Sequence, residues 1–339
     1  NTLSTASIAP LVSFNSVEWE SNHLGCISNI RTQLGDKPLI VRSSCAREDT
    51  AESSNAGAFT TLLNVTSDQL VDAVNDVFLS YGKLHPQDEV LIQPMLENVT
   101  QSGVAFSHDP NTGSPYRIIN WTEGSDTTLV TGGRGGRVWQ MAGGSQAQNN
   151  PSLTPIVLML EELLELFGGM PIDCEFASTF EADVLTLWLL QIRPLILAED
   201  SESEGAQLGR LEQIKRKVNR GMRPHPFLLG SRTAYGVMPD WNPAEIIGIR
   251  PKPLALSLYR ELVTDSIWAY QRHNYGYRNL RSFMLMPNFF GMPYIDVRVS
   301  FNSFIPAELN EDIGARLVDY YIDTLVSEPS LHDKVKFEI

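Results

Sequence analysis

The chain has 339 residues, of which 42% are hydrophobic and 19% are charged, and its net charge is −14. This length is enough for two domains, the composition excludes wholesale disorder, and no apolar run reaches the roughly 18 to 20 residues of a membrane span. The acidic balance argues against nucleic acid or an anionic membrane as a partner, because both require a basic surface.

The first part of the chain alternates strand-like apolar runs with two helical patterns. Ser67 is expected to cap a helix that ends at Gly82, and a second helix is expected from about Thr154 to Phe167. This mixture predicts an α+β fold with antiparallel strand pairing. The predicted strands are residues 38–42, 90–94, 103–107, 116–121 and 127–131.

Two later segments, which are expected to be neighbouring strands, carry polar side chains at alternate positions. Asp173 and Glu175 share one face of the first strand, and Gln191 and Arg193 share one face of the second. The intervening residues 179–183 are few enough for a hairpin. If the strands pair, the four polar groups meet beside a sheet and can hold a divalent metal together with nucleotide phosphates. The alternative is an ordinary exposed strand face with polar cross-strand partners.

An acidic segment at residues 199–209 has the composition of a linker. It divides a first domain, residues 1–198, from a second, residues 210–339. Helical spacing at residues 254–270 and 312–326 predicts that the second domain is mostly helical.

Several other features have competing interpretations. Residues 236–245 are interpreted as a rigid connector whose Trp241 packs into a core. The alternative is an acceptor-binding loop. The glycine run at residues 132–136 favours a flexible turn over a phosphate-binding loop. The basic stretch at residues 215–223 is interpreted as a solvated helix face. Three cysteines without C-x-x-C spacing indicate neither a disulfide framework nor a zinc site, so a cytoplasmic location is expected.

Five sequence blocks, in one order between Leu39 and Leu195, resemble the nucleotide-binding domain of phosphoenolpyruvate synthase and pyruvate phosphate dikinase. An ordered set of this kind is more specific than a lone motif. The resemblance implies an ATP-grasp fold for the first domain. The blocks are residues 41–49 with 55–59 and 63–65, residues 92–95, residues 102–106 with 109–113, residues 173–176 and residues 190–194.

The same resemblance implies ATP and Mg²⁺ as cofactors and assigns roles to individual residues. Arg42 and Arg193 are implied as catalytic residues, and Asp173 and Glu175 as metal ligands. The loop around Gly57 is either a plain turn or a segment that closes over phosphates. Contacts with the nucleotide are implied for Arg42, Gln93, Glu123, Gln191 and Arg193.

In the family that the chain resembles, ATP phosphorylates a histidine on a separate swivelling domain, which passes the phosphoryl group to an acceptor. The chain shows neither a clear Gly-rich, lysine-bearing segment before its first strand nor a Thr-Ser-His segment. It is therefore expected to be a fragment of a dikinase-like phosphotransferase, with the carrier histidine outside it and a small acceptor such as pyruvate. A non-catalytic ATP-sensing scaffold and an ATP-grasp carboxylate ligase are the alternatives. The acceptor, the oligomeric state and the role of the second domain stay open.

Overall fold

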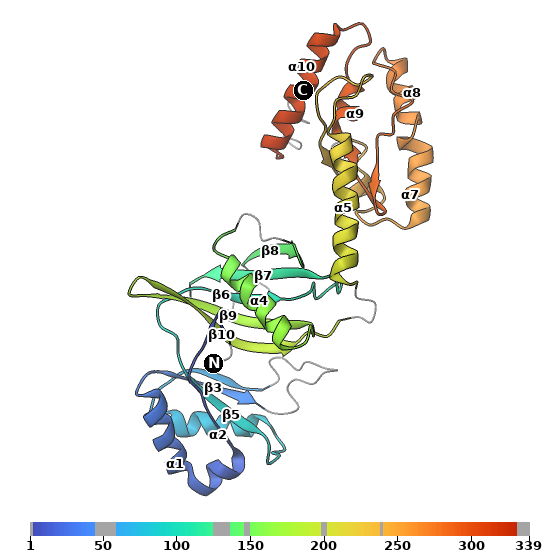
Figure 1. The fold of residues 1–339 in the computed structure, drawn as a ribbon. Coiled ribbons are helices and arrows are strands. Elements are labelled where there is room, and N and C mark those ends of the chain that lie inside the picture. The colour runs from blue at the N-terminus through green and yellow to red at the C-terminus, as the bar shows by residue number, and fades with distance from the viewer. Residues whose placement is uncertain are drawn as a thin grey trace. The chain divides into compact units, whose positions relative to one another are not determined.

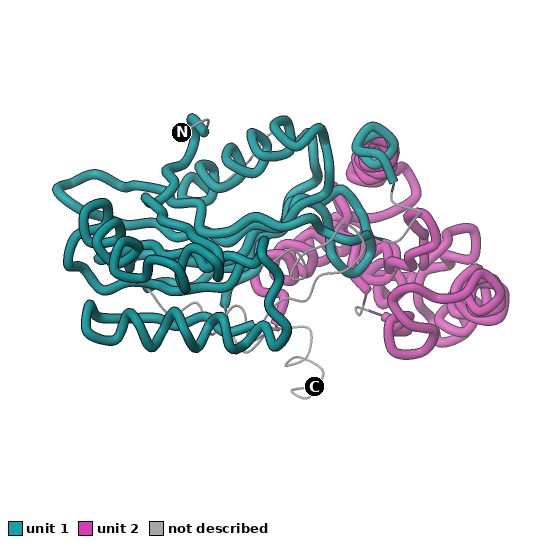
Figure 2. Tube along the Cα trace, turned by 90° about the horizontal axis from the view of Figure 1, so that it is seen from below, with its two compact units in different colours: residues 1–209 teal, residues 210–339 magenta. Residues whose placement is uncertain are grey.

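The computed structural model of the chain describes residues 3–44, 59–124, 136–145, 150–197, 202–237 and 240–330. These residues belong to two compact units, unit 1 (residues 1–209) and unit 2 (residues 210–339), which Figure 2 colours separately. The predicted strand at residues 127–131, the loop around Gly57 and residues 132–135 of the glycine run lie outside the described residues.

Unit 1 contains a six-stranded sheet in the order β1-β10-β9-β6-β7-β8. All its neighbouring strands are antiparallel except β1 and β10, which are parallel. Helix α4 (Thr154–Leu166) covers one face of this sheet (Figure 1) and packs its apolar side chains against the strands in a shared core. The strands are β1 (Ser7–Ile8), β6 (Val99–Phe106), β7 (Tyr116–Glu123), β8 (Arg137–Ala142), β9 (Ile172–Glu181) and β10 (Val184–Pro194).

Strands β9 and β10 form the hairpin predicted from the sequence. Their turn consists only of Ala182 and Asp183, which have φ values of 48° and 63°. Two consecutive positive φ values are typical of a type I′ turn, whose twist matches that of the flanking strands. The strands are therefore longer than predicted, because most of residues 179–183 belongs to β9.

Unit 1 also contains a four-stranded antiparallel sheet in the order β2-β5-β3-β4. Burial alternates along β3, so that Leu39 and Val41 face a core shared with two helices, while Ile40 and Arg42 face the other way. The elements are β2 (Val12–Asn15), β3 (Leu39–Ser44), β4 (Thr61–Val65), β5 (Glu89–Pro94), α1 (Ser16–Leu34) and α2 (Leu70–Ser80).

The N-termini of the two helices differ from the sequence predictions. Helix α2 begins at Leu70, and no side chain caps it, so the prediction that Ser67 is its cap was wrong. Helix α1 was not predicted. It begins with a capping box. The Asn15 side chain accepts from the backbone N–H of Glu18, and the Glu18 carboxylate accepts from the backbone N–H of Asn15.

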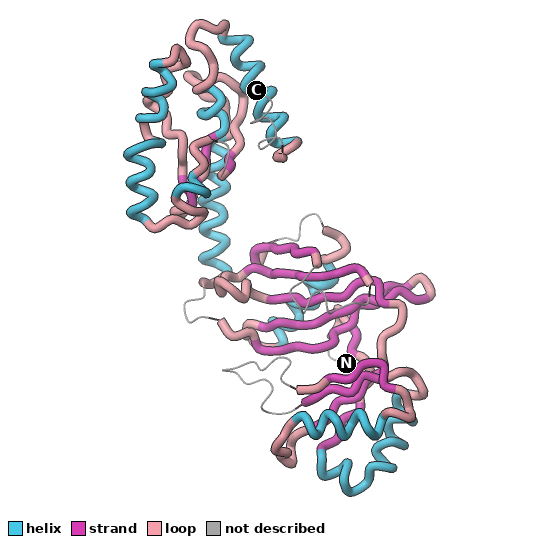
Figure 3. The backbone as a smooth tube through the Cα atoms, turned by 180° about the vertical axis from the view of Figure 1, so that it is seen from behind, coloured by secondary structure: helices cyan, strands magenta, loops and turns pink. Residues whose placement is uncertain are grey.

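The regular structure of unit 2 is mainly helical (Figure 3), and its strands are only two residues long. Helix α5 (Glu204–Gly221) begins within the segment predicted as an acidic linker, so residues 204–209 are part of a helix. None of the helices among the described residues has both the length and the apolar character needed to cross a membrane. The remaining elements are β11 (Tyr235–Gly236), α6 (Pro243–Ile246), α7 (Pro253–Tyr259), the π-helix η1 (Arg260–Thr264), α8 (Ile267–Asn274), β12 (Asn288–Phe289), β13 (Met292–Pro293), β14 (Ile295–Asp296), α9 (Val297–Asn302) and α10 (Glu311–Ser327).

Candidate functional site

The polar side chains of the β9–β10 hairpin lie directly opposite one another. In the strand register Arg193 pairs with Asp173, and Gln191 pairs with Glu175. Arg193 Nε lies 3.2 Å from Asp173 Oδ1, and an Arg193 terminal nitrogen lies 4.0 Å from Glu175 Oε1. The three charged side chains are 15%, 16% and 26% exposed, so the cluster is partly shielded from water.

The alternation of β9 explains why both carboxylates reach one face of the sheet. Cys174 and Phe176 point to the other face, where they are fully buried in the core under α4. Burial raises the pKa of the Cys174 thiol to about 12, which excludes it as a nucleophile at neutral pH. The apolar residues of β9 thus fix the strand, and the residues between them carry the polar groups.

Arg42 joins this cluster from the other sheet of unit 1. Its guanidinium donates to Gln191 Oε1 at 2.6 Å and to the Leu190 carbonyl oxygen at 3.2 Å. The pairing of β9 and β10 is irregular at this point, where the register shifts between Leu189 and Gln191. A bulge of this kind leaves the extra residue without a ladder partner. The irregularity therefore leaves the Leu190 carbonyl to accept from Arg42.

A pocket of about 410 Å³ lies between the two sheets at this contact. Arg42, Gln93 and Gln191 line it from β3, β5 and β10 respectively, so the structure brings three of the predicted nucleotide contacts together. Polar and apolar side chains share the wall, which suits a ligand with an ionic part and a flat apolar part. The other lining residues are Ile8, Leu11, Ser43, Ser44, Leu91, Leu189, Leu190 and Ile192.

Glu123 lies apart from this cluster. It is exposed at the end of β7 and pairs with Arg137 at 3.0 Å. On the shared neighbour β6, Glu123 lies opposite Gln101, whereas Asp173 lies opposite Phe106. Five residues of strand separate these positions by about 17 Å. The structure thus does not bring Glu123 to the other predicted site residues.

The two carboxylates fit the way in which magnesium binds beside a nucleotide. Magnesium is usually held by one or two carboxylates, with phosphates and waters as the other ligands. Asp173 and Glu175 provide this number of hard oxygen donors on one face of β9. A group of three or more histidine, cysteine or acidic side chains suited to a metal does not occur among the described residues.

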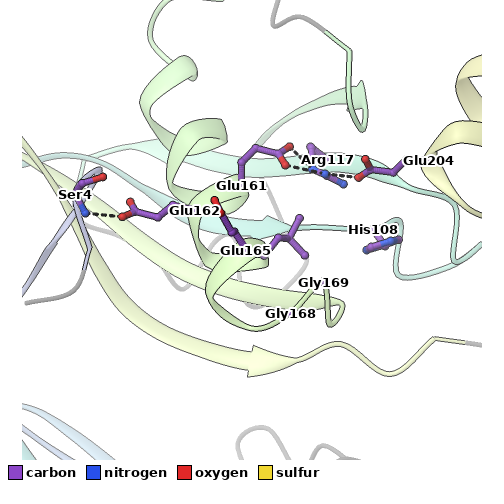
Figure 4. A pocket seen from close by; sticks show the side chains of 10 residues that line it. Ser4, His108, Arg117, Glu161, Glu162, Glu165, Gly168, Gly169 and Glu204 are labelled. Carbon is purple, nitrogen blue, oxygen red and sulfur yellow. Dashed lines mark hydrogen bonds and ion pairs between the residues drawn. The ribbon is translucent and has the colours of Figure 1, made fainter.

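A second pocket, of about 920 Å³, lies beside α4 and was not predicted from the sequence. One of its lining residues is Arg117, which is 1% exposed and donates to Glu161 and Glu204 (Figure 4). Arg117 also donates to the Ser107 carbonyl at 2.8 Å. The guanidinium lies between the two carboxylates, which come from α4 and α5. A buried cation requires such partners, because a buried charge without them destabilises the fold.

His108 lies at the edge of this second pocket (Figure 4). Burial, and then the charge of Arg117, lower the pKa of its imidazole, whereas Glu204 and Glu161 act in the opposite sense. Its ring Nδ1 lies 3.0 Å from the Ser107 hydroxyl oxygen. The Ser107 contact and the partial burial hold the His108 ring at the edge of the pocket.

The loop that was predicted to be a rigid connector differs from that prediction at Trp241. The side chain of Trp241 is 38% exposed and its φ is 50°, so it does not pack into a core. The preceding Asp240 anchors the loop, because it accepts from Arg272 at 3.2 Å and from the Ser300 hydroxyl at 2.8 Å. Residues 238 and 239 lie outside the described residues.

Comparison with known proteins supports the sequence resemblance for part of unit 1. The family model described as the AMP/ATP-binding domain of pyruvate phosphate dikinase matches residues 17–138. This stretch contains Arg42 and Gln93, whereas the β9–β10 hairpin lies beyond it. The sequence matches no curated protein.

Among solved structures, a D-alanine-D-alanine ligase from Helicobacter pylori is 16% identical, with a TM-score of 0.32 over 61% of this chain and 56% of the ligase. The ligase from Coxiella burnetii is 10% identical, with a TM-score of 0.31 over 56% of this chain and 43% of the ligase. An acetyl-coenzyme A synthetase from Ca. Korarchaeum cryptofilum is 8% identical, with a TM-score of 0.34 over 56% of this chain and 87% of the synthetase. The chain thus spans about half the length of the two ligases.

The family match, rather than these structural similarities, carries the comparison. It confirms over residues 17–138 the resemblance that the sequence blocks indicate: this part of the chain is similar to the AMP/ATP-binding domain of pyruvate phosphate dikinase.

Proposed function

We propose that unit 1 binds magnesium ATP in the pocket between its two sheets, in an ATP-grasp arrangement. The observation that carries this proposal is the meeting of Arg42, from β3, with Gln191, from β10, beside the Asp173–Arg193 pair. Arg42 from the four-stranded sheet, together with Arg193 and the two carboxylates of the six-stranded sheet, suits a metal-bearing polyphosphate. The family match at residues 17–138 supports an adenine nucleotide as the ligand.

Each residue of the cluster has a distinct role in this proposal. Arg42 and Arg193 bind phosphate oxygens, because a guanidinium presents a fork of N–H donors to them. Gln191 orients Arg42 through the 2.6 Å hydrogen bond between their side chains, and Gln93 contacts the nucleotide from β5. Asp173 and Glu175 hold the magnesium ion, which neutralises charge on the phosphates when it is bound.

The reaction that we propose is a dikinase-like phosphoryl transfer to a carrier histidine outside this chain, and from there to a small acceptor such as pyruvate. Phosphoryl transfer requires positioning and charge neutralisation more than covalent chemistry by the protein. The arginines and carboxylates of the cluster provide both. A cytoplasmic location stays a prediction.

The test uses the full-length protein that contains this chain, incubated with magnesium ATP that carries a labelled phosphate. An acid-labile, base-stable label on the protein is expected, because phosphohistidine has this stability. Asp173→Asn in the same protein should abolish the labelling, and Asp183→Asn, at the exposed hairpin turn, should retain it.

Three other outcomes contradict the proposal in different ways. Binding of magnesium ATP without any label on the protein supports the ATP-sensing scaffold. Labelling of a carboxylate substrate as an acyl phosphate supports the ligase. Labelling that persists at the wild-type rate in Asp173→Asn shows that the phosphoryl group is transferred at another site.

A further inference from the structure

Unit 2 contains a pocket of its own, on one face of α5. It has a volume of about 320 Å³ and lies between α5 and the β12–β13 hairpin. Positions 213, 214 and 217 of α5 fall on one side of the helix, because residues three or four apart share a face. The volume is at the lower end of the range for small-molecule sites, about 300 to 1,000 Å³. The lining residues are Gln213, Ile214, Lys217, Asn288, Phe289 and Phe290.

The hairpin contains a bulky residue in an unfavourable backbone conformation. Phe290 and Gly291 form its two-residue turn, with φ values of 50° and 87°. Turns with two positive φ values favour Asn-Gly, since a bulky side chain is strained there. Phe290 is 56% exposed, so burial does not offset this strain. Strained residues of this kind cluster at ligand-binding sites.

Two cations lie over the aromatic rings of this hairpin. Lys217 Nζ lies 5.1 Å from the centre of the Phe289 ring and donates to the Asn288 carbonyl. The Arg210 guanidinium lies 5.5 Å from the centre of the Phe290 ring. A carbonyl takes one of the three N–H donors of a lysine ammonium, and an anion can accept from the others. This basic spot contrasts with the net charge of −14 of the whole chain.

Both walls of the pocket are held in place by contacts outside it. Phe289 packs edge-on against Tyr235 and Tyr294, with ring centres 5.4 Å and 5.2 Å away. The end of α5 is fixed by the buried Arg298, which donates to the Gly221 carbonyl at 2.9 Å. A pocket with rigid walls binds its ligand at a lower cost in conformational entropy.

We propose that this pocket binds a small organic anion with a flat, aromatic body. The carboxylate or phosphate of the ligand accepts from Lys217, and its flat body lies against Ile214 and Phe290. The exposed, strained phenylalanine and the lysine thus acquire a shared role. The site is separate from the ATP site proposed in unit 1 and does not depend on it.

The test is a calorimetric titration of the protein with phenyl phosphate, compared with inorganic phosphate and phenol. Phenyl phosphate should bind saturably and about tenfold more tightly than either fragment, because it combines the anion with the ring. Lys217→Gln should weaken its binding about tenfold by removing the charge. Lys215→Gln removes the same charge from a helix position that does not line the pocket, and should leave the affinity unchanged.

Phe290→Asn is the second variant, and it separates binding from folding. Asparagine is favoured in this turn, so the melting temperature should stay the same or rise while phenyl phosphate binds about tenfold more weakly. Arg193→Ala should leave the affinity for phenyl phosphate unchanged, which distinguishes this site from the ATP site.

The absence of saturable binding would overturn the proposal. So would unchanged affinity in Lys217→Gln or in Phe290→Asn, or an equal loss in Lys215→Gln. A loss confined to Arg193→Ala would place the phenyl phosphate in unit 1 and would also overturn it.

Discussion

Arg193 faces Asp173 across the β9–β10 pairing, with its Nε 3.2 Å from Asp173 Oδ1. The guanidinium also lies 4.0 Å from Glu175, so one cation serves both carboxylates. A ligand that brings its own metal and phosphates changes the partners of all three groups. In the proposed complex, the carboxylates hold the metal and the guanidinium holds the phosphates.

Arg193→Ala should therefore change the affinities for Mg²⁺ and ATP in opposite directions. Free Mg²⁺ should bind more tightly, because the neighbouring positive charge is gone. ATP should bind about tenfold to a hundredfold more weakly, whereas AMP should lose much less, because Arg193 is proposed to contact the outer phosphates. Titration calorimetry with each ligand measures all three effects.

Arg137→Ala removes an exposed arginine that pairs with Glu123 and serves as the control. Equal losses for ATP and AMP would refute the role of Arg193.

Asp173→Asn combined with Glu175→Gln should abolish magnesium-dependent ATP binding while the protein stays folded. The substitutions keep the size of both side chains but remove the charges that magnesium requires. The affinity should be compared with and without Mg²⁺, and far-UV circular dichroism should confirm the fold. Asp183→Asn removes a carboxylate from the exposed turn of the same hairpin and should have no effect. An unchanged response to Mg²⁺ in the double variant would place the metal elsewhere.

Arg42 and Gln191 should be energetically coupled, since their hydrogen bond of 2.6 Å joins the two sheets of unit 1. We expect a coupling free energy of about 0.5 to 1.5 kcal/mol in a double-mutant cycle of Arg42→Ala and Gln191→Ala. Urea unfolding of the four proteins gives this value. The same cycle on ATP affinity should also be non-additive, because Gln191 is proposed to orient Arg42. Additive effects in both measurements would show that the contact is incidental.

The sequence was sufficient to predict the polar face of β9 and β10, because strand alternation is a local property. Asp173 and Glu175 alternate with the buried Cys174 and Phe176, and a period of two is readable without any partner strand. The contact between Arg42 and the Leu190 carbonyl was not predictable in this way. It depends on how two sheets approach each other and on a bulge in β10, and neither leaves a local pattern.

Two other features show where sequence analysis failed and why. Helix α1 is only weakly amphipathic and has a kink at Asn22, so its helical period is faint, although the Asn15–Glu18 capping box was a usable signal. Arg117 carried no signal at all. Its carboxylate partners, Glu161 and Glu204, lie 44 and 87 residues further along the chain, and only the tertiary fold brings them together.

Arg117→Met should destabilise unit 1 by about 3 kcal/mol, because it leaves two carboxylates and a buried carbonyl without their donor. The lower end of the range for a broken buried pair applies, since the Glu161 and Glu204 side chains are 42% and 40% exposed. Arg216→Met, at an exposed arginine that pairs with Glu212, is the matched control and should cost about 0.5 kcal/mol or less. Urea unfolding compares the two variants, and equal losses would contradict a structural role for Arg117.

His108 should make the stability of unit 1 depend on pH below neutrality. Burial and Arg117 lower the pKa of His108 from its usual value of 6.5, so the unfolded state binds the proton more readily than the folded state. The contribution of His108 to the free energy of unfolding is fully present above pH 6.5. It is lost as the pH falls through 6.5 towards the lowered pKa, and the free energy then changes by at most about 1.4 kcal/mol per pH unit. Urea unfolding between about pH 5 and 7.5 should show this slope, and His108→Gln should reduce it.

NMR titration of the His108 ring gives an independent check, because Arg117→Met should raise the midpoint by removing the nearby positive charge. A wild-type midpoint at or above 6.5, or the same slope in His108→Gln, would contradict this account.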